Sequence, residues 1–416
     1  MHQSPDVLIF GLNYPPEPTG IAPYTGALAT GLTQRGFQVT SYVAHPHYPE
    51  WRIREGYGAW SSTERRDGVE LHRLRHYLPR NPRGIRRLLS ELSFGLRLTF
   101  RRIGRPRIVI AVSPSLFSTA LVLARLRLTP RRPPVAVWVQ DIYTLGLTEI
   151  GEGGGVVQRV TRWVESHALG AADLVVVIHE RFKEYVTNEL GVAAEKVVVV
   201  RNWTHLPPWE PIDPATAKAQ LGWPDGVVLA VHTGNMGAKQ GLENILDAAR
   251  LADEHGEDVQ FLLVGDGGER RSLELAAQDV CRVTFIDPLD DNDYRMALAA
   301  ADVLIVNEKQ GVASMAVPSK LTSYFAAGRP VVAATDPTGI TASEVTAAAA
   351  GIVVPAGDPE ALLNAIRHLH NDKDAAARFG FNGQKYRAAV LDQAAAMQRW
   401  VDLVEEKGSA QTLDTP

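Results

Sequence analysis

The stretch Val227–Leu242, VVLAVHTGNMGAKQGL, decides the fold of this chain. It joins a short apolar run to a loop that holds three glycines and one cation, Lys239, and a helix-like pattern of apolar residues follows. This order predicts a buried strand, a tight turn and the N-terminus of a helix. Because glycines let backbone N–H groups approach an anion and a helix N-terminus adds partial positive charge, the stretch predicts a phosphate site.

The composition is typical of a soluble globular protein. The chain has 416 residues, of which 45% are hydrophobic and 22% charged, and its length favours two domains of similar size. The one cysteine, Cys281, excludes a disulfide framework and suits a reducing cytoplasm. The N-terminus resembles a strand rather than a signal peptide, and no run of about 18 apolar residues predicts a transmembrane helix. We therefore expect a cytoplasmic protein.

Charge is distributed unevenly along the chain, although the net charge is only −4. Residues 1–210 carry 26 Lys and Arg against 18 Asp and Glu, and the remaining residues carry 17 against 29. Within 80–132 there are 13 arginines and a single acid, Glu91. Net charge bears on binding partners rather than on the fold. This basic block therefore predicts that the first half of the chain lies near an anionic surface of a partner.

Near-continuous apolar runs alternate with helical patterns along both halves, which indicates parallel sheets covered by helices on both faces. The fold class is therefore α/β, with two doubly wound, Rossmann-like domains. Ligands of such sheets bind beyond the carboxyl ends of the strands, so these loops are expected to line a cleft between the domains. The predicted strands are 7–12, 38–44, 108–113, 135–140, 174–179 and 196–202, then 227–233, 259–266, 282–287, 302–308, 330–335 and 351–355.

The proline-rich stretch His205–Pro214, HLPPWEPIDP, interrupts the alternation and is interpreted as a linker. It separates an N-terminal domain, 1–205, from a C-terminal domain, 206–385. Helices over 386–406 are expected to return toward the N-terminal domain, and 407–416 is expected to be a flexible tail.

Three loops of the second half follow strands and are expected to converge on one site. The first is the glycine loop with Lys239, the second is Gly265–Gly268, GDGG, and the third, VPSK, places Ser319 and Lys320 on the first turn of a helix. A hydroxyl and an ammonium group at a helix N-terminus suit a diphosphate. Taken alone, GDGG also fits ordinary turn chemistry and Lys320 a solvated lysine. It is the three loops together, in this order, that indicate a single site.

Five segments of the second half, HTGNMGAKQGL, FLLVGDG, RVTFIDPL, AADVLIV and VPSKLTSYFAAGRPVVA, resemble family-4 glycosyltransferases of the GT-B fold. The closer likeness is to bacterial enzymes of exopolysaccharide, capsule or O-antigen synthesis (the colanic-acid type). It extends to the N-terminal GLNYPPEPTGIAPYTGALATGLTQRGFQVT and covers nearly the whole chain. The resemblance implies a nucleotide-diphosphate sugar as donor, a lipid-linked saccharide or glycan as acceptor, and retention of the anomeric configuration.

The resemblance also assigns binding residues on both halves of the chain. On the donor side it implies diphosphate contacts from Asn235, Lys239, Ser319 and Lys320, glycines against the nucleotide sugar at Gly234 and Gly265, and a base site near Phe285 and Ile286. On the acceptor side it implies that Gly20, in the loop Pro18–Thr19–Gly20, faces the cleft.

This chain departs from the family pattern at two points. Asn235 stands where many members have an arginine, and Met315 and Ser323 stand where many have two glutamates eight positions apart. The missing glutamate pair removes side chains that the resemblance would assign to the donor sugar and ribose. Lys239 and Lys320 remain for the diphosphate.

Transfer from a nucleotide donor requires that the leaving diphosphate be stabilised as its charge develops, which lysines and helix termini can do without a metal ion. Lys239, Lys320 and Asp141 are therefore the predicted catalytic residues, although Asp141 also fits a loop cap. The other acids and histidines that end strands are weaker candidates. They are Glu308, His179, Glu180, His45 and His47. Of these, His45 and His47 are expected to shape an acceptor loop.

No metal or other cofactor is expected. The acidic run Asp290–Asp293 precedes a helical pattern and is interpreted as a helix cap rather than a metal site. No histidine or cysteine spacing suggests zinc.

The arginine-rich segment 83–107 combines its charges with apolar residues at helical spacing. A basic amphipathic helix of this kind can lie on an anionic membrane surface, which would place the protein on the inner face of the cell membrane. The alternative is the solvated face of a helix that packs within its own domain. Nucleic acid is not an expected partner, because the segment has little aromatic interleaving.

The sequence thus predicts a retaining glycosyltransferase. Two alternatives stay open: a nucleotide-sugar epimerase on a GT-B-like fold, and a non-catalytic GT-B protein that binds a glycan. A nicotinamide oxidoreductase is not expected, because no complete GxGxxG follows a strand.

Overall fold

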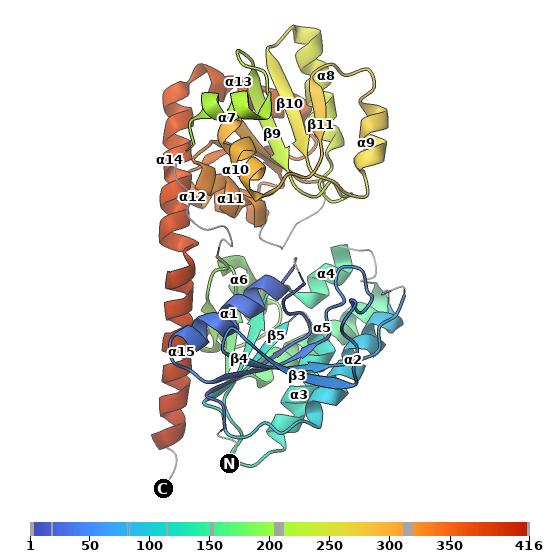
Figure 1. Cartoon of the computed structure of the whole chain (residues 1–416), viewed down its shortest axis with the longest axis vertical. Coiled ribbons are helices and arrows are strands. Elements are labelled where there is room, and N and C mark those ends of the chain that lie inside the picture. Colours follow the sequence, from blue (N-terminus) through green and yellow to red (C-terminus); the bar gives the residue numbers. More distant parts are fainter. Residues whose placement is uncertain are drawn as a thin grey trace. The chain divides into compact units, whose positions relative to one another are not determined.

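The computed structural model describes residues 4–17, 20–80, 82, 84–113, 115–149, 154–203, 212–310 and 319–413. The chain divides into two compact units (Figure 1), which are Met1–Asn202 with Gln393–Pro416 (unit 1) and Trp203–Asp392 (unit 2). The boundary expected at 205/206 lies outside the described residues.

Unit 1 is built on a sheet with the strand order β3-β4-β2-β1-β5-β6-β7-β8. All neighbouring strands are parallel except β3 and β4, which form an antiparallel hairpin at one edge. The sequence missed this hairpin because β3, SSTERR, is polar and almost entirely exposed, so it lacks an apolar pattern. The strands are β1 (Val7–Gly11), β2 (Val39–Ala44), β3 (Ser61–Arg66), β4 (Val69–Leu74), β5 (Ile108–Ser113), β6 (Val135–Val139), β7 (Leu174–Val177) and β8 (Val197–Val199).

Helices of unit 1 follow its strands. Within this set α2 packs against α3, and α3 against α5. The close approach of α2 to α3 depends on Gly95, because a Cβ there would lie 2.7 Å from the Cα of Ser118. No helix in the described part of the chain is long and apolar enough to span a membrane. The helices are α1 (Ala22–Gln34), α2 (Ile85–Thr99), α3 (Leu116–Arg127), α4 (Tyr143–Glu149), α5 (Gly155–Ala171) and α6 (Glu180–Asn188).

Unit 2 is built on a parallel sheet with the order β11-β10-β9-β12-β13-β14. Successive residues of a strand enter different cores, as Ala230 and Val231 of β9 do, so both faces of the sheet are buried. This is why its strands are continuous apolar runs. The strands are β9 (Val228–Thr233), β10 (Val259–Val264), β11 (Val283–Ile286), β12 (Val303–Asn307), β13 (Val331–Thr335) and β14 (Gly351–Pro355).

Eight helices of unit 2 are described. They are α7 (Pro214–Leu221), α8 (Glu243–His255), α9 (Arg270–Ala276), α10 (Asp291–Ala300), α11 (Ser319–Ala327), α12 (Ile340–Ala348), α13 (Pro359–Asn371) and α14 (Lys373–Val390). The α10 helix begins as the sequence predicts, because the Asp290 carboxylate accepts the N–H groups of Asn292 and Asp293 at 2.9 Å each.

The C-terminal helix α15 (Gln393–Leu413) belongs to unit 1, where it packs against α1. The division between the units falls after Asp392 rather than at the expected 385/386, which lies inside α14. The helix also continues into the segment 407–416, which the sequence predicts as a flexible tail. At Gly408 this helix lies against Arg107, with 3.2 Å between the position of a Cβ there and the Arg107 Cβ.

Candidate donor site

The first two glycine loops of unit 2 meet through their backbones. Gly234, directly after β9, has a φ of +106°, and its N–H donates to the Val264 carbonyl at 2.8 Å. Gly265, directly after β10, has a φ of +137°, and a Cβ at this position would lie 2.1 Å from the Gly234 carbonyl oxygen. Both the backbone angles and the close approach therefore require glycine.

The third loop reaches the same point through Lys320. Its Nζ lies 4.0 Å from the position that a Gly234 Cβ would occupy. Ser319 begins α11 as predicted, but its side chain is outside the described part of the structure. Unit 2 thus brings Gly234, Gly265 and Lys320 together, as the order of the loops predicts.

A buried histidine positions the Lys320 ammonium group. The Lys320 Nζ lies 3.3 Å from Nε2 of His232, and Nδ1 of His232 lies 3.2 Å from the Ile305 carbonyl oxygen. A carbonyl accepts only, so the Nδ1–H tautomer donates to Ile305 and leaves Nε2 facing the ammonium group, while the ring also bonds to the Asn235 backbone. Sequence reasoning did not single out His232, although a polar residue inside the apolar run VVLAVHT was a visible signal.

Burial sets the charges at this position. It lowers the pKa of Lys320 to about 8, and the nearby Glu308 carboxylate opposes this shift. Burial, together with the Lys320 charge, lowers the pKa of His232 well below its usual value, so the imidazole is neutral. One ammonium group, poorly hydrated and held beside a glycine turn, is an arrangement that favours an anionic ligand.

Lys239 and Asn235 lie on the same loop as Gly234, and both are exposed. The backbone around Lys239 is fixed, because its carbonyl accepts the N–H of Lys309 at 2.8 Å. The loop therefore presents the Lys239 side chain to solvent from a held backbone.

Asn307, at the end of β12, holds the rest of the loop. Its Nδ2 donates to the carbonyls of Gln240 and Gly241, at 2.8 Å each, and its Oδ1 accepts from Asn244 at 2.8 Å. The Asn307 side chain is buried. Asn307 is a positioning residue that sequence reasoning missed, and its signal was an amide at the end of the apolar run DVLIV.

Glu308 does not replace the missing glutamate pair. It is buried, and its two carboxylate oxygens accept the hydroxyls of Thr335 and Thr341. Its carboxylate therefore links β12 to β13 and α12, which is a structural role. Of the two positions where the family has glutamates, Met315 is outside the described residues and Ser323 is buried in α11.

Phe285 and Ile286 end β11 with their side chains on opposite faces of the sheet, each against a different core. The Ile286 carbonyl accepts the Gly265 N–H at 2.9 Å. Arg270, which occupies the third glycine position of a dinucleotide motif, donates to the Gly265 carbonyl at 2.9 Å and pairs with Asp287 at 2.7 Å. These bonds hold the end of β11 against the second glycine loop.

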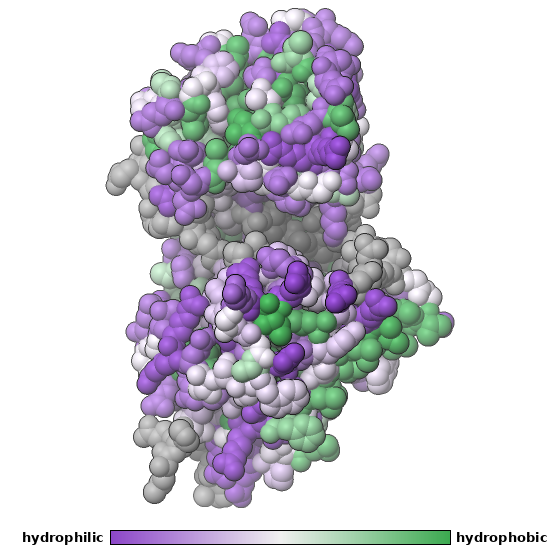
Figure 2. Space-filling view, turned by 45° about the vertical axis from the view of Figure 1, so that its right-hand side comes forward, coloured by the Kyte–Doolittle hydropathy of each residue, from purple (hydrophilic) through white to green (hydrophobic). Residues whose placement is uncertain are grey.

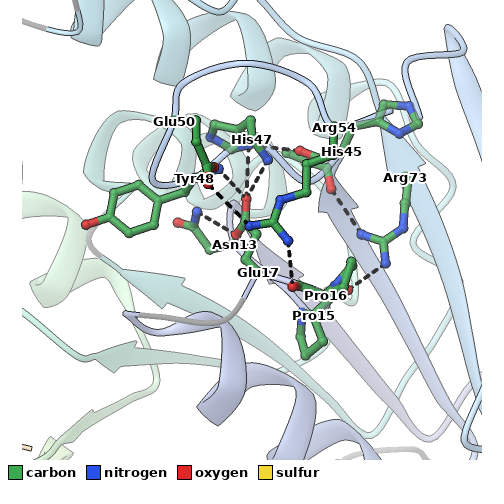
Figure 3. A network of polar contacts seen from close by, with 11 residues as sticks. Asn13, Pro15, Pro16, Glu17, His45, His47, Tyr48, Glu50, Arg54 and Arg73 are labelled. Atoms are coloured by element: carbon green, nitrogen blue, oxygen red, sulfur yellow. Dashed lines mark hydrogen bonds and ion pairs between the residues drawn. The ribbon is translucent and has the colours of Figure 1, made fainter. Parts of the chain in front are cut away.

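In unit 1, a buried carboxylate organises the loop that leads to Gly20. Oε1 of Glu17 accepts the N–H groups of His47 and Tyr48 at 2.8 and 2.9 Å, and Oε2 accepts from Asn13 at 2.9 Å (Figure 3). Gly20 has a φ of +67° and lies against the Tyr48 ring. His47 thereby shapes this loop, while Pro18 and Thr19 are outside the described residues.

Asp141 lies between β6 and α4 and is half-buried. The start of α4 is held by Glu165, whose carboxylate accepts the N–H groups of Tyr143 and Thr144 at 2.7 and 3.0 Å. His179 acts as a helix cap, because its Nδ1 accepts the Arg181 N–H at 3.1 Å at the start of α6. This bond engages one nitrogen of the His179 ring in local structure.

Comparisons with known proteins agree with this architecture. Residues 19–203 match the "Glycosyl transferase 4-like domain", and residues 228–372 match "Glycosyl transferases group 1". The chain is 33% identical to a putative colanic acid biosynthesis glycosyl transferase of Escherichia coli K12, over 77% of this chain and 81% of that protein. It is 27% identical to a probable glycosyltransferase of Pseudomonas aeruginosa, over 69% and 72%.

Solved structures share the fold over nearly the whole chain. Sucrose-phosphate synthase from Thermosynechococcus elongatus matches with a TM-score of 0.72 and 21% identity, covering 97% of this chain and 99% of that one. The Anabaena protein HepE, in complex with UDP and glucose, matches with a TM-score of 0.66 and 17% identity, covering 96% and 99%. The chain therefore belongs to the family of GT-B glycosyltransferases that join a 4-like N-terminal domain to a group 1 C-terminal domain.

Proposed function

We propose that this glycosyltransferase transfers a sugar from a nucleotide-diphosphate donor to a lipid-linked saccharide or glycan in the synthesis of a cell-surface polysaccharide. The observation that carries the donor assignment is the Lys320 ammonium group beside the contact between Gly234 and Gly265. The similarity to the colanic acid glycosyl transferase supports the polysaccharide assignment. The HepE complex supports a nucleotide donor.

In this proposal the leaving diphosphate binds where the two glycine turns expose backbone and Lys320 supplies charge. Lys320 is held by His232 before the ligand arrives, so little reorganisation is needed as negative charge develops on the leaving group. Lys239 adds a second charge from the exposed side of the loop. These groups act without a metal ion, and the transferred sugar keeps its anomeric configuration, as family membership suggests.

The test is turnover with a panel of UDP- and GDP-sugars and a glycan acceptor, with the products identified. Lys320→Ala and Lys239→Ala are expected to lower kcat by about 10²–10³, the usual loss when one stabilising group is removed. Lys385→Ala, an exposed lysine of α14, is the matched control and should retain wild-type turnover.

Thermal unfolding of the nucleotide-free variants would verify that they fold. Wild-type turnover in both variants would overturn the site assignment. Sugar conversion without an acceptor would favour an epimerase, and tight donor binding with no product would favour a non-catalytic protein.

We also propose that unit 1 attaches to an anionic membrane surface through α2. One face of α2 is buried by packing, through Phe94, Gly95 and Leu98. A second face leaves large apolar side chains in solvent, including Ile85 at 71% and Phe100, just after the helix, at 85% exposure. Figure 2 shows hydrophobic side chains among hydrophilic ones on the surface of unit 1. Packing within the unit and a membrane-facing stripe thus use different faces of the same helix.

A further inference from the structure

Unit 1 contains a groove of about 840 Å³ between two loops that follow neighbouring strands. One loop follows β2 and the other follows β4, and these strands are adjacent in the sheet. None of the residues assigned to the donor site or to catalysis lines this groove. Its walls are Glu50, Trp51, Arg52, Ile53, Arg75, His76, Tyr77, Leu78 and Arg80.

The charge of the groove favours an anion. Arg52, Arg75 and Arg80 are exposed along it, against a single carboxylate, Glu50. That carboxylate is paired with Arg54 at 3.7 Å. Three guanidinium groups around one groove are suited to phosphate, whose oxygens accept paired N–H donors.

His76 adds a requirement of the opposite kind, for a hydrogen-bond donor. Its Nε2 is buried and has no hydrogen-bond partner, while the ring bonds to the Leu74 backbone. Burial, with smaller effects of His47 and His45, lowers the pKa of His76 to about 3, so the ring is neutral. The nitrogen bonded to the backbone carbonyl carries the proton, which leaves Nε2 as an unsatisfied acceptor. A sugar hydroxyl group satisfies it, whereas an unprotonated phosphate oxygen, which only accepts, does not.

The groove is also connected to α2. The Tyr77 N–H donates to Ser93 Oγ of α2 at 2.9 Å, and Arg97 of α2 donates to the Arg75 carbonyl at 3.1 Å. The groove is therefore held against the helix whose other face carries the exposed apolar stripe. A ligand in the groove that continued into a lipid would pass along this helix.

We infer that this groove binds the sugar–phosphate junction of the acceptor, with the phosphate on the three arginines and a hydroxyl of the adjoining sugar on His76. The aromatic side chains of Trp51 and Tyr77 line the remaining wall. Ligand pockets commonly combine such aromatic walls with a few polar groups at fixed positions. The inference rests on the proposed function, because it names the chemistry of the acceptor that the proposed function leaves open.

Binding of glucose 1-phosphate, glucose and inorganic phosphate to the full chain, measured by titration calorimetry, tests it without turnover. The wild type is expected to bind glucose 1-phosphate more tightly than either fragment. The triple variant Arg52→Ala/Arg75→Ala/Arg80→Ala should weaken the binding of glucose 1-phosphate by about tenfold or more, because charge-assisted hydrogen bonds are lost. The matched control is Arg65→Ala/Arg66→Ala, on the exposed β3, which should leave it unchanged.

His76 has its own readout. His76→Phe is expected to remove the preference for glucose 1-phosphate over inorganic phosphate while leaving phosphate binding intact, and His76→Gln, which keeps an acceptor, should restore part of it. Unchanged binding of glucose 1-phosphate in the triple variant would overturn the inference, and so would equal affinity for phosphate and glucose 1-phosphate in the wild type.

A second arm separates a lipid-linked ligand from a free sugar phosphate. The probe is a polyprenyl phosphate that carries one glucose, in phosphatidylcholine vesicles, with plain vesicles as the control. Cosedimentation with the loaded vesicles, lost in the triple arginine variant, supports a lipid-linked acceptor; binding of the soluble sugar phosphate alone overturns that part. UDP binding should be the same in wild type and triple variant. If the wild type bound neither UDP nor GDP, the proposed function would be overturned and the groove result would still stand.

Discussion

Lys320 shows how a single residue can oppose stability in order to bind a ligand. Its ammonium group is partly buried beside a neutral imidazole, and its folded-state pKa of about 8 lies below the ordinary value of 10.5. Below pH 8 the group is charged in both the folded and the unfolded chain, so the cost of the buried charge is fully present. Between about pH 8 and 10.5 the unfolded chain binds the additional proton, so this contribution to the free energy of unfolding rises with pH.

Replacing this charge should therefore stabilise the protein. We expect Lys320→Met to increase the free energy of unfolding of the nucleotide-free protein near neutral pH by at most about 3 kcal/mol, and so to raise its Tm. This increase should shrink toward pH 10. In the proposed function a nucleotide diphosphate raises the Tm of the wild type, and the same variant should lose this rise, because a ligand stabilises only the state that it binds. Calorimetric scans with and without UDP measure both effects, and Lys385→Met is the control. A lower Tm at neutral pH would contradict the interpretation of a strained buried charge.

At the scale of elements, α2 has two faces of different character. Its packing face fits α3 so closely that Gly95 is required, and its outer face carries exposed apolar residues and arginines. Arg97 holds the fold together, because its guanidinium group lies 3.8 Å from the ring centroid of Trp60 and donates to two backbone carbonyls. The exposed positions, Arg86 and Arg102, are free for substitution without disturbing these contacts.

Membrane attachment through α2 predicts two separable losses. Arg86→Glu/Arg102→Glu should weaken binding to phosphatidylglycerol-containing vesicles by about tenfold or more, because each basic residue near an anionic surface contributes about 1 kcal/mol. Ile85→Ser/Phe100→Ser should weaken binding to the same vesicles with less dependence on salt. Flotation with anionic and with neutral vesicles measures both, and Arg65→Glu/Arg66→Glu is the matched charge control. Equal flotation of all four proteins would exclude α2 as the contact.

At the scale of the whole molecule, the chain passes between the two units twice, near Asn202 and near Asp392. The second passage gives unit 1 a helix from the far end of the sequence. Trp400 of α15 is fully buried and packs edge-on against Trp138 of β6, with ring centroids 5.2 Å apart. Unit 1 is therefore incomplete until the last helix has been made.

Removing this contact should destabilise one unit only. Trp400→Ala is expected to lower the stability of unit 1 by about 3–5 kcal/mol, the usual cost of deleting a buried large aromatic side chain. Calorimetry should show the transition of unit 1 moving to lower temperature, while the transition of unit 2 stays in place. Phe381→Ala, at a residue of α14 that is 65% exposed, is the control. Equal shifts of both transitions would contradict the assignment of α15 to unit 1.

Much of the fold could be predicted from the sequence, because a strand buried on both faces must be apolar at every position and its period is local. All twelve strands expected from apolar runs are present among the described residues. The polar β3 could not be predicted in this way, because an exposed edge strand needs no apolar face. Its partner β4 was missed although VELHRL alternates apolar and polar residues and is buried in that pattern. The unit to which α15 belongs also follows from packing rather than from local pattern.

For the candidate site, the sequence by itself determined which loops would meet: carboxyl ends of parallel strands share one edge, so the loops with Gly234, Gly265 and Lys320 had to lie near one another. Only the tertiary structure decided how close they lie and what holds them. The 3.3 Å contact of Lys320 with His232 joins residues far apart in the chain, and so does the hold of Asn307 on the glycine loop. Such contacts depend on strand register and side-chain packing, which no local pattern of residues encodes.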